Sequence, residues 1–176
     1  MNRPGPNSYI VPDTRLIGGE YPYDQDPEKG LQKLYACLDA GITCFIDLTE
    51  AIDGLEPYEP ALLAEAEARG QIVRRINLPV RDCGVPTPQR AAEIIDAIDA
   101  ELQAGGTVYL HCWGGVGRTG TIVGCFLRER GLPADEAIAA VERLFQTTSA
   151  DKRRRHPNGT FHSSEQREFV RTWSRE

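Results

Sequence analysis

The segment of residues 107–120 constrains the fold of this chain more than any other. It reads Thr-Val-Tyr-Leu-His-Cys-Trp-Gly-Gly-Val-Gly-Arg-Thr-Gly. Its first residues are mostly β-branched, aromatic or apolar, which predicts a strand, and a glycine cluster then leads into apolar residues at helical spacing. These apolar positions are Ile122, Val123, Phe126 and Leu127. The segment therefore predicts a strand, a tight loop and the start of a helix.

The loop of this segment has the composition of an anion-binding turn. Five residues separate Cys112 from Arg118, and three of them are glycines, so the backbone can curl until successive N–H groups point at one centre. The following helix directs the positive end of its dipole to the same place. This field favours the thiolate form of Cys112, which is nucleophilic, and the planar guanidinium of Arg118 suits two phosphoryl oxygens. We predict a site for a tetrahedral oxyanion.

A different interpretation of the same residues is a buried cysteine in the glycine turn of a dinucleotide-binding fold. That turn requires G-x-G-x-x-G with an acidic residue about 20 positions further on. A nucleotide P-loop requires a lysine where Arg118 stands. Residues 112–118 fit neither pattern, so the oxyanion site is favoured.

The sequence His-Cys-Trp-Gly-Gly-Val-Gly-Arg-Thr-Gly resembles the signature loop of the cysteine-dependent protein tyrosine phosphatases, in particular their small dual-specificity-like branch. In that loop, His-Cys is followed by five residues, Arg, Ser or Thr, and Gly. The resemblance implies a phosphocysteine intermediate that water then hydrolyses, without a metal or a cofactor. The residues that it implies for phosphate binding are Cys112, Trp113, Gly114, Gly115, Val116, Gly117 and Arg118.

The resemblance also assigns roles to two neighbours of the nucleophile. Thr119 stands at the family's hydroxyl position, where it would donate to the sulfur and help it leave in the second step. His111 is the family's preceding histidine and would orient the loop from behind, without transferring a proton. Without such an activity, His111 would simply be a histidine whose hydrogen bonds are satisfied in the core.

A general acid is expected in the loop Leu78-Pro-Val-Arg-Asp-Cys-Gly-Val-Pro86. Cleavage of the P–O bond leaves an oxyanion that must be protonated, and a carboxylic acid on a mobile loop can approach bound substrate. Asp82 occupies the place of the family's general acid, in a loop similar to Pro-Ile-x-Asp-x-x-x-Pro. The alternative is a turn aspartate that hydrogen-bonds its own backbone. Asp47, Glu50 and Asp53 are other possible acids, although we interpret Asp47 as the brace of a neighbouring loop.

Two features near the C-terminus have more than one interpretation. Tyrosine phosphatases place a glutamine that positions the hydrolytic water near the position of Gln166, which is otherwise an ordinary first-turn helix residue. The run Lys152-Arg-Arg-Arg-His156 is either a solvated helix end or loop, or a basic rim that attracts phosphorylated, acidic substrates. No aromatic residue is interleaved with it, which disfavours a nucleic-acid role.

The thiolate form of Cys112 is also vulnerable to oxidation. Cys44, Cys83 and Cys125 are each possible partners in a protective disulfide, and each is otherwise a small buried apolar residue. The sequence does not choose among them.

Strand and helix signals alternate along the rest of the chain. Strands are predicted at 15–20, 42–49, 72–80 and 107–112, and helices at 27–40 and 60–69, from Thr87 to Gly105, after Arg118, after Pro133, and around Phe169 and Val170. With right-handed crossovers, this alternation predicts an α/β fold: a mostly parallel central sheet flanked by helices, with the active loop at the carboxyl end of one strand. We expect an extended N-terminal arm at 1–13 and a phosphatase catalytic domain at 14–176.

Composition restricts the class of protein further. The 176 residues suffice for one domain but not for two ordinary ones, and 40% hydrophobic with 26% charged residues is typical of a soluble protein. The first eight residues lack the apolar core of a signal peptide, so we expect a cytoplasmic location. Five cysteines without a CxxC pair argue against a disulfide framework and against a zinc site. The net charge of −6 disfavours a general nucleic-acid binder.

The sequence therefore predicts a metal-independent phosphomonoester hydrolase that acts on a phosphorylated protein or peptide and releases inorganic phosphate. Residues 113–117 lack the lysine of phosphoinositide-selective relatives, which favours phosphotyrosine, with phosphoserine and phosphothreonine as further substrates. Inositol phosphates are an alternative, particularly if Lys152, Arg153, Arg154 and Arg155 fold over the cleft, and RNA 5′-triphosphates are another. A phosphate-binding module without turnover is the alternative of another class.

Overall fold

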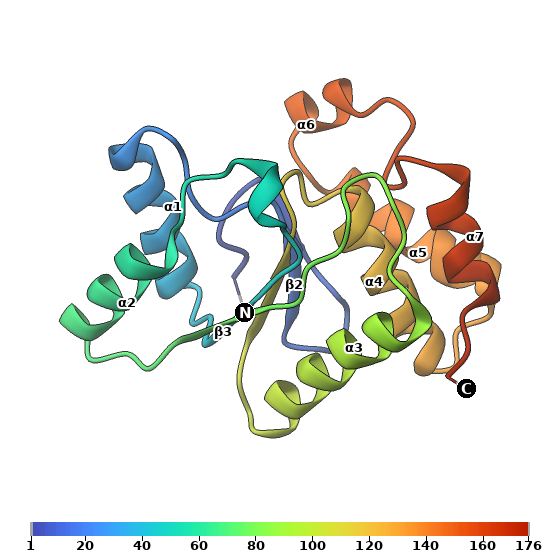
Figure 1. Ribbon diagram of the computed structural model, residues 1–176, viewed down its shortest axis with the longest axis horizontal. Coiled ribbons are helices and arrows are strands. Elements are labelled where there is room, and N and C mark those ends of the chain that lie inside the picture. Colours follow the sequence, from blue (N-terminus) through green and yellow to red (C-terminus); the bar gives the residue numbers. More distant parts are fainter. Residues whose placement is uncertain (1, 176) are drawn as a thin grey trace.

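A five-stranded sheet forms the centre of the computed structural model, which describes residues 2–175 (Figure 1). The strands are β1 (Ser8–Ile10), β2 (Leu16–Gly19), β3 (Cys44–Asp47), β4 (Arg74–Asn77) and β5 (Val108–His111). Their order is β1-β2-β5-β3-β4, and β1 pairs antiparallel with β2 while the other pairs are parallel. The α/β class with a mostly parallel central sheet, predicted from the sequence, is confirmed.

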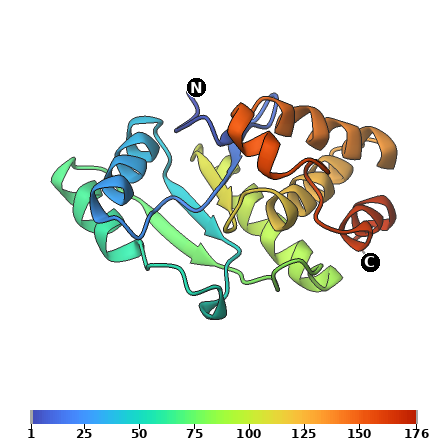
Figure 2. The same ribbon diagram turned by 90° about the horizontal axis from the view of Figure 1, so that it is seen from above.

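Helices cover both faces of this sheet. They are α1 (Pro27–Asp39), the short 3₁₀ helix η1 (Ala51–Asp53), α2 (Glu59–Ala68), α3 (Pro88–Gln103), α4 (Gly117–Glu129), α5 (Ala134–Gln146), α6 (Ala150–Arg155) and α7 (Ser164–Thr172). Figure 2 shows α1 and α2 on one face and α3, α4, α5 and α7 on the other. Within residues 2–175, none of these helices has both the length and the apolar character that crossing a bilayer requires.

The strands divide their side chains between the two helical layers. Side chains alternate between the faces of a strand, so neighbouring residues enter different cores. The core beneath α3, α4, α5 and α7 receives Leu16, Ile46 and Leu110. The core beneath α1 and α2 receives Ile17, Phe45 and Tyr109. Because the central strands are buried on both faces, they read in the sequence as near-continuous apolar runs.

Polar caps fix two helix starts where the sequence predicts helices. The Asp26 carboxylate accepts a hydrogen bond from the Glu28 N–H at the start of α1, and Thr87 Oγ1 accepts one from the Arg90 N–H at the start of α3. A proline follows each cap, because the first helical position needs no backbone donor. The second cap ends the loop that carries Asp82.

Two segments differ from the sequence prediction, and a third, the basic run, agrees with its interpretation as a helix end. Within the expected arm at 1–13, Ser8–Ile10 form the edge strand β1, which pairs with β2. The strand predicted at 72–80 is shorter, because β4 covers Arg74–Asn77 and the Ile72 side chain is 92% exposed. The basic run forms the helix α6, where Ser149 Oγ accepts a hydrogen bond from the Lys152 N–H. The sheet thus begins inside the predicted arm.

The carboxyl ends of four parallel strands lie at one edge of the sheet. His111 of β5 pairs with Gly19 of β2 on one side and with Asp47 of β3 on the other, and Asp47 pairs in turn with Asn77 of β4. The loops that leave these strands therefore meet above the same edge, where ligands bind in parallel α/β folds.

Candidate active site

The loop between β5 and α4 is a tight turn that only a particular arrangement of glycines permits. Gly115 has a φ of 64°, in the left-handed region, and a Cβ on it would lie 2.3 Å from the backbone carbon and oxygen of Gly19. The Tyr21 N–H donates to the Trp113 carbonyl at 2.9 Å, which fixes the loop to the segment after β2. The turn is thus pressed against its neighbouring strand.

The sulfur of Cys112 lies inside this turn. It accepts a hydrogen bond from the Gly115 N–H and one from the Thr119 hydroxyl, each at 3.2 Å. The helix α4 begins at Gly117, so its unpaired N–H groups and its dipole face the same region. Cys112 is only 3% exposed. These donors stabilise negative charge on the sulfur, which is the form that attacks as a nucleophile.

The guanidinium of Arg118 is buried, and its two edges differ. Nη1 donates to Asp53 Oδ2 at 2.7 Å and to the backbone carbonyls of Leu48 and Val80 at 3.3 and 3.2 Å. Nε and Nη2 have no hydrogen-bond partner among the described residues. Nη2 does lie 3.0 Å from Asp82 Oδ1, an ion-pair distance without the geometry of a hydrogen bond. One edge of the guanidinium is therefore anchored, and the other is available to an oxyanion.

Asp53 has a position that sequence reasoning missed. The sequence suggested it only as a possible acid, whereas its carboxylate anchors Arg118 and also accepts the Glu50 N–H at 3.1 Å in the cap of η1. Its side chain is 5% exposed. No local pattern in the sequence signals a contact across so many residues.

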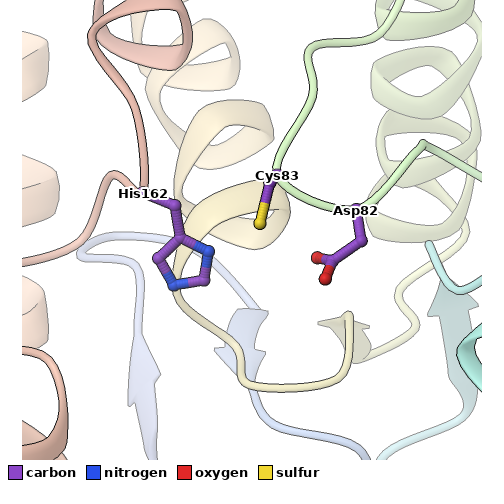
Figure 3. Close-up of side chains that lie close together, drawn as sticks. All are labelled: Asp82, Cys83 and His162. Carbon is purple, nitrogen blue, oxygen red and sulfur yellow. The ribbon is translucent and has the colours of Figure 1, made fainter.

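Asp82 lies on the loop between β4 and α3, with a side chain that is 44% exposed. It faces Arg118. The structure thus brings together the loop of residues 112–118, which we call the nucleophile loop, and the predicted acid loop. Asp82, Cys83 and His162 also form a group of side chains compact enough to hold a metal ion (Figure 3). Glu50 does not belong to this group of three side chains. It is the N-cap residue of η1.

Gln166 connects the acid loop to the last helix. Its Oε1 accepts the His162 N–H and its Nε2 donates to the Gly84 carbonyl, both at 2.9 Å. Gln166 is fully buried. Its amide would be in close contact with a Cβ on Gly117, so it packs against the nucleophile loop. Both ends of the amide are thus occupied, and Gln166 joins three segments of the site.

His111 and Asp47 support the loop from behind, without exposure to solvent. His111 Nδ1 lies 3.4 Å from the Cys112 carbonyl, which can only accept, and Nε2 lies 2.8 Å from the Tyr58 hydroxyl. Burial lowers the pKa of His111 to about 4, so the ring is neutral and Nε2 accepts from Tyr58. Asp47 accepts from the N–H and hydroxyl of Thr49, which confirms its interpretation as a loop brace.

A cleft of about 530 Å³ opens beside the exposed rim of the loop. Its lining includes Trp113, which is 55% exposed, Gly114, and Lys152 and Arg155 of α6. Lys152 is 2% exposed, since its ammonium is paired with the Glu20 carboxylate at 2.9 Å. The basic run therefore lies beside the cleft, and the charge of its first residue, Lys152, is already balanced by Glu20.

The other cysteines differ in their burial. All five thiols are free. Cys44 in β3 and Cys125 in α4 are completely buried in the core, whereas Cys83 is exposed on the loop of Asp82.

The chain matches a family of known domains over most of its length. Residues 8–170 match the model described as "PTP-SAK: Swiss Army Knife protein, DSP-PTPase phosphatase domain". Over 127 residues the chain is 33% identical to "Putative tyrosine phosphatase 067L" of Invertebrate iridescent virus 3. This alignment covers 68% of the chain but 45% of the viral protein, so the chain spans less than half of that relative's length.

Solved structures have the same fold. The active form of Tk-PTP is similar with a TM-score of 0.65 and 28% sequence identity, covering 94% of each chain. PTPMT1 in complex with PI(5)P is similar with a TM-score of 0.66 and 19% identity, covering 94% of this chain and 92% of that one.

The steric restriction at Gly115 generates a first prediction. Gly115→Ala adds a Cβ against the Gly19 backbone at a positive φ, so the loop must open. We expect the affinity for vanadate, measured by isothermal titration, to fall at least about fivefold, since such strain is worth roughly 1–3 kcal/mol. Gly114→Ala is the matched control, because its Cβ meets only Val116 Cγ2 at 3.8 Å. Equal affinities of the two variants would contradict this account of the loop.

Proposed function

The chain belongs to the family of DSP-PTPase phosphatase domains, and we propose that it hydrolyses phosphomonoesters through a phosphocysteine intermediate, with phosphotyrosine in proteins as its main substrate. The observation that carries the proposal is a pair of donors on buried Arg118, Nε and Nη2, that make no hydrogen bond within residues 2–175, Nη2 being only ion-paired with Asp82, next to a sulfur that itself accepts two hydrogen bonds. Buried polar atoms without partners are rare in folded proteins, so an anion is the natural complement.

In the first step that we propose, Cys112 Sγ attacks phosphorus. The S–P bond forms while the P–O bond to the leaving group breaks, and Arg118 Nε and Nη2 with the loop amides hold the other phosphoryl oxygens. Asp82 gives its proton to the departing oxygen. The substrate phosphate would replace the Asp82 carboxylate beside Arg118 Nη2.

In the second step, water attacks phosphorus and the S–P bond breaks. Asp82, now a carboxylate, accepts the proton of the water, and the Thr119 hydroxyl donates to the departing thiolate, a contact supported by the 3.2 Å separation. A water contact of Gln166 would replace one of its present bonds to Gly84 and His162. We therefore propose that Gln166 positions the acid loop. It could contact the hydrolytic water only after its hydrogen bond to Gly84 or to His162 has opened.

The proposed substrate class follows from the surroundings of the loop. Exposed Trp113 offers an aromatic surface at the rim, beside which a phosphotyrosine ring can pack. Lys152 is buried and paired with Glu20, so it is not a free clamp for extra phosphates, whereas Arg154 and Arg155 pair with Asp151 only at the exposed surface. Inositol phosphates, such as the PI(5)P bound in the PTPMT1 complex, are the second candidate class because α6 flanks the cleft.

We also propose that the protein works in a reducing compartment such as the cytoplasm. The mechanism requires the thiol of Cys112, and all five cysteines are free.

The cysteine mechanism predicts hydrolysis of para-nitrophenyl phosphate without added metal. We expect full activity in the presence of a chelator and inhibition by vanadate, which mimics the phosphoryl group in transit. Cys112→Ser should abolish turnover in this colorimetric assay while retaining the fold and the binding of phosphate. Activity that survives Cys112→Ser, or that requires a divalent metal, would exclude the phosphocysteine intermediate.

The proposed role of Asp82 predicts a dependence on the leaving group. Asp82→Asn should lower kcat by roughly 10²-fold or more on an alkyl phosphate, and less on para-nitrophenyl phosphate, whose leaving group needs no proton. Glu165→Gln, an exposed change in the first turn of α7, is the control and should leave both rates unchanged. If Asp82→Asn keeps the rate on the alkyl ester, Asp82 is not the general acid.

A substrate panel distinguishes the candidate classes. We expect kcat/KM to be highest for a phosphotyrosine peptide and lower for a phosphothreonine peptide, inositol phosphates and an RNA with a 5′-triphosphate. A higher value for an inositol phosphate would assign α6 to substrate binding. Binding of all four without turnover would instead identify a phosphate-binding module.

A further inference from the structure

We propose that Asp82, Cys83 and His162 form a binding site for Zn²⁺, and that a zinc ion bound there reversibly inhibits the enzyme. One potential ligand atom of each residue lies within 4.8 Å of the other two. Figure 3 shows the three side chains directed toward one another from two loops, one before α3 and one before α7. Zinc bonds of about 2.0–2.3 Å place tetrahedral ligands about 3.3–3.8 Å apart, so small rotations of these exposed side chains complete the site.

The kinds of donor atom favour zinc over the common hard cations. A cysteine sulfur, a histidine nitrogen and a carboxylate oxygen are the three ligand types that zinc takes in proteins. Mg²⁺ and Ca²⁺ prefer oxygen ligands throughout. Three protein ligands leave the fourth position to water, and all three side chains are exposed, so the ion can enter and leave without unfolding.

The ligands differ in the protons that they must lose. The imidazole of His162 binds zinc in its neutral form. The sulfur of Cys83 binds zinc as a thiolate. Zinc must therefore displace the proton of the Cys83 thiol, and binding releases that proton to the solvent.

Inhibition would follow from the double position of Asp82. Its carboxylate belongs to the proposed metal site and also lies 3.0 Å from Arg118 Nη2. A carboxylate that is bound to zinc cannot carry the proton that the leaving group requires. The inhibition thus rests on the proposed function of Asp82, whereas the binding of zinc does not.

The nucleophile is the competing thiol, and the structure favours Cys83 over it. Cys112 is 3% exposed and its sulfur already accepts two hydrogen bonds inside the loop. Cys83 lies on the surface, with a second and a third ligand beside it.

Cobalt absorption tests the binding independently of activity. Co²⁺ takes the place of Zn²⁺ in such sites, and a thiolate ligand gives it a charge-transfer band that added Zn²⁺ abolishes by displacement. We expect Cys112→Ser to keep this band and Cys83→Ser to lose it. His162→Gln should weaken the affinity for Co²⁺ at least about tenfold, because losing a metal ligand costs more than losing a residue that only hydrogen-bonds a ligand. Glu165→Gln, the matched control on α7, should bind as the unsubstituted protein does. A band that survives Cys83→Ser, or that disappears in Cys112→Ser, would overturn the site.

Zinc titrations of the phosphatase assay test the inhibition. The concentration of Zn²⁺ that halves the rate should rise at least about tenfold in Cys83→Ser relative to the unsubstituted protein and to Glu165→Gln. The same half-inhibiting concentration in all three would overturn the inhibitory role. A protein that binds Co²⁺ through Cys83 but has no phosphatase activity without zinc would instead refute the proposed function and leave the metal site in place.

Discussion

The buried positive charge of Arg118 is the constraint on which the rest of the site depends. A guanidinium that is about 1% exposed must be paired, because an isolated charge is unstable away from water. Its anchors come from two separate segments: the connection after β3, with the Leu48 carbonyl and Asp53 of η1, and the connection after β4, with the Val80 carbonyl. The guanidinium therefore points into the nucleophile loop only when the sheet edge and both neighbouring loops are folded.

Features encoded by neighbouring residues were predictable from the sequence. The strand, loop and helix around Cys112 lie within one short segment, and its glycine pattern restricts the backbone directly. The caps at Asp26 and Thr87 are equally local, since each side chain binds an N–H group within three residues of itself. The fold class followed from the alternation of such elements, and it is shared by the known relatives of the chain.

Features that depend on distant contacts were not predictable. The anchor Asp53 reaches Arg118 across the site, and β1 is a strand only because β2 lies beside it. The absence of a CxxC pair argued against zinc, yet Cys83 and His162 belong to segments far apart in the chain that the fold brings together. The spacing of residues in the sequence can reveal metal ligands that lie on one turn or one helix. It cannot reveal metal ligands that come from two facing loops.

The two tryptophans of the chain occupy opposite environments. The indole of Trp113 is half in water at the rim of the nucleophile loop, whereas Trp173, just after α7, is 5% exposed and packs against Phe169 at 5.7 Å between ring centroids. Their intrinsic fluorescence therefore separates two events. Emission from Trp113 reports whether the loop is occupied, and emission from Trp173 reports whether the fold is intact. The protein therefore contains both a fluorescent probe of binding and an internal reference.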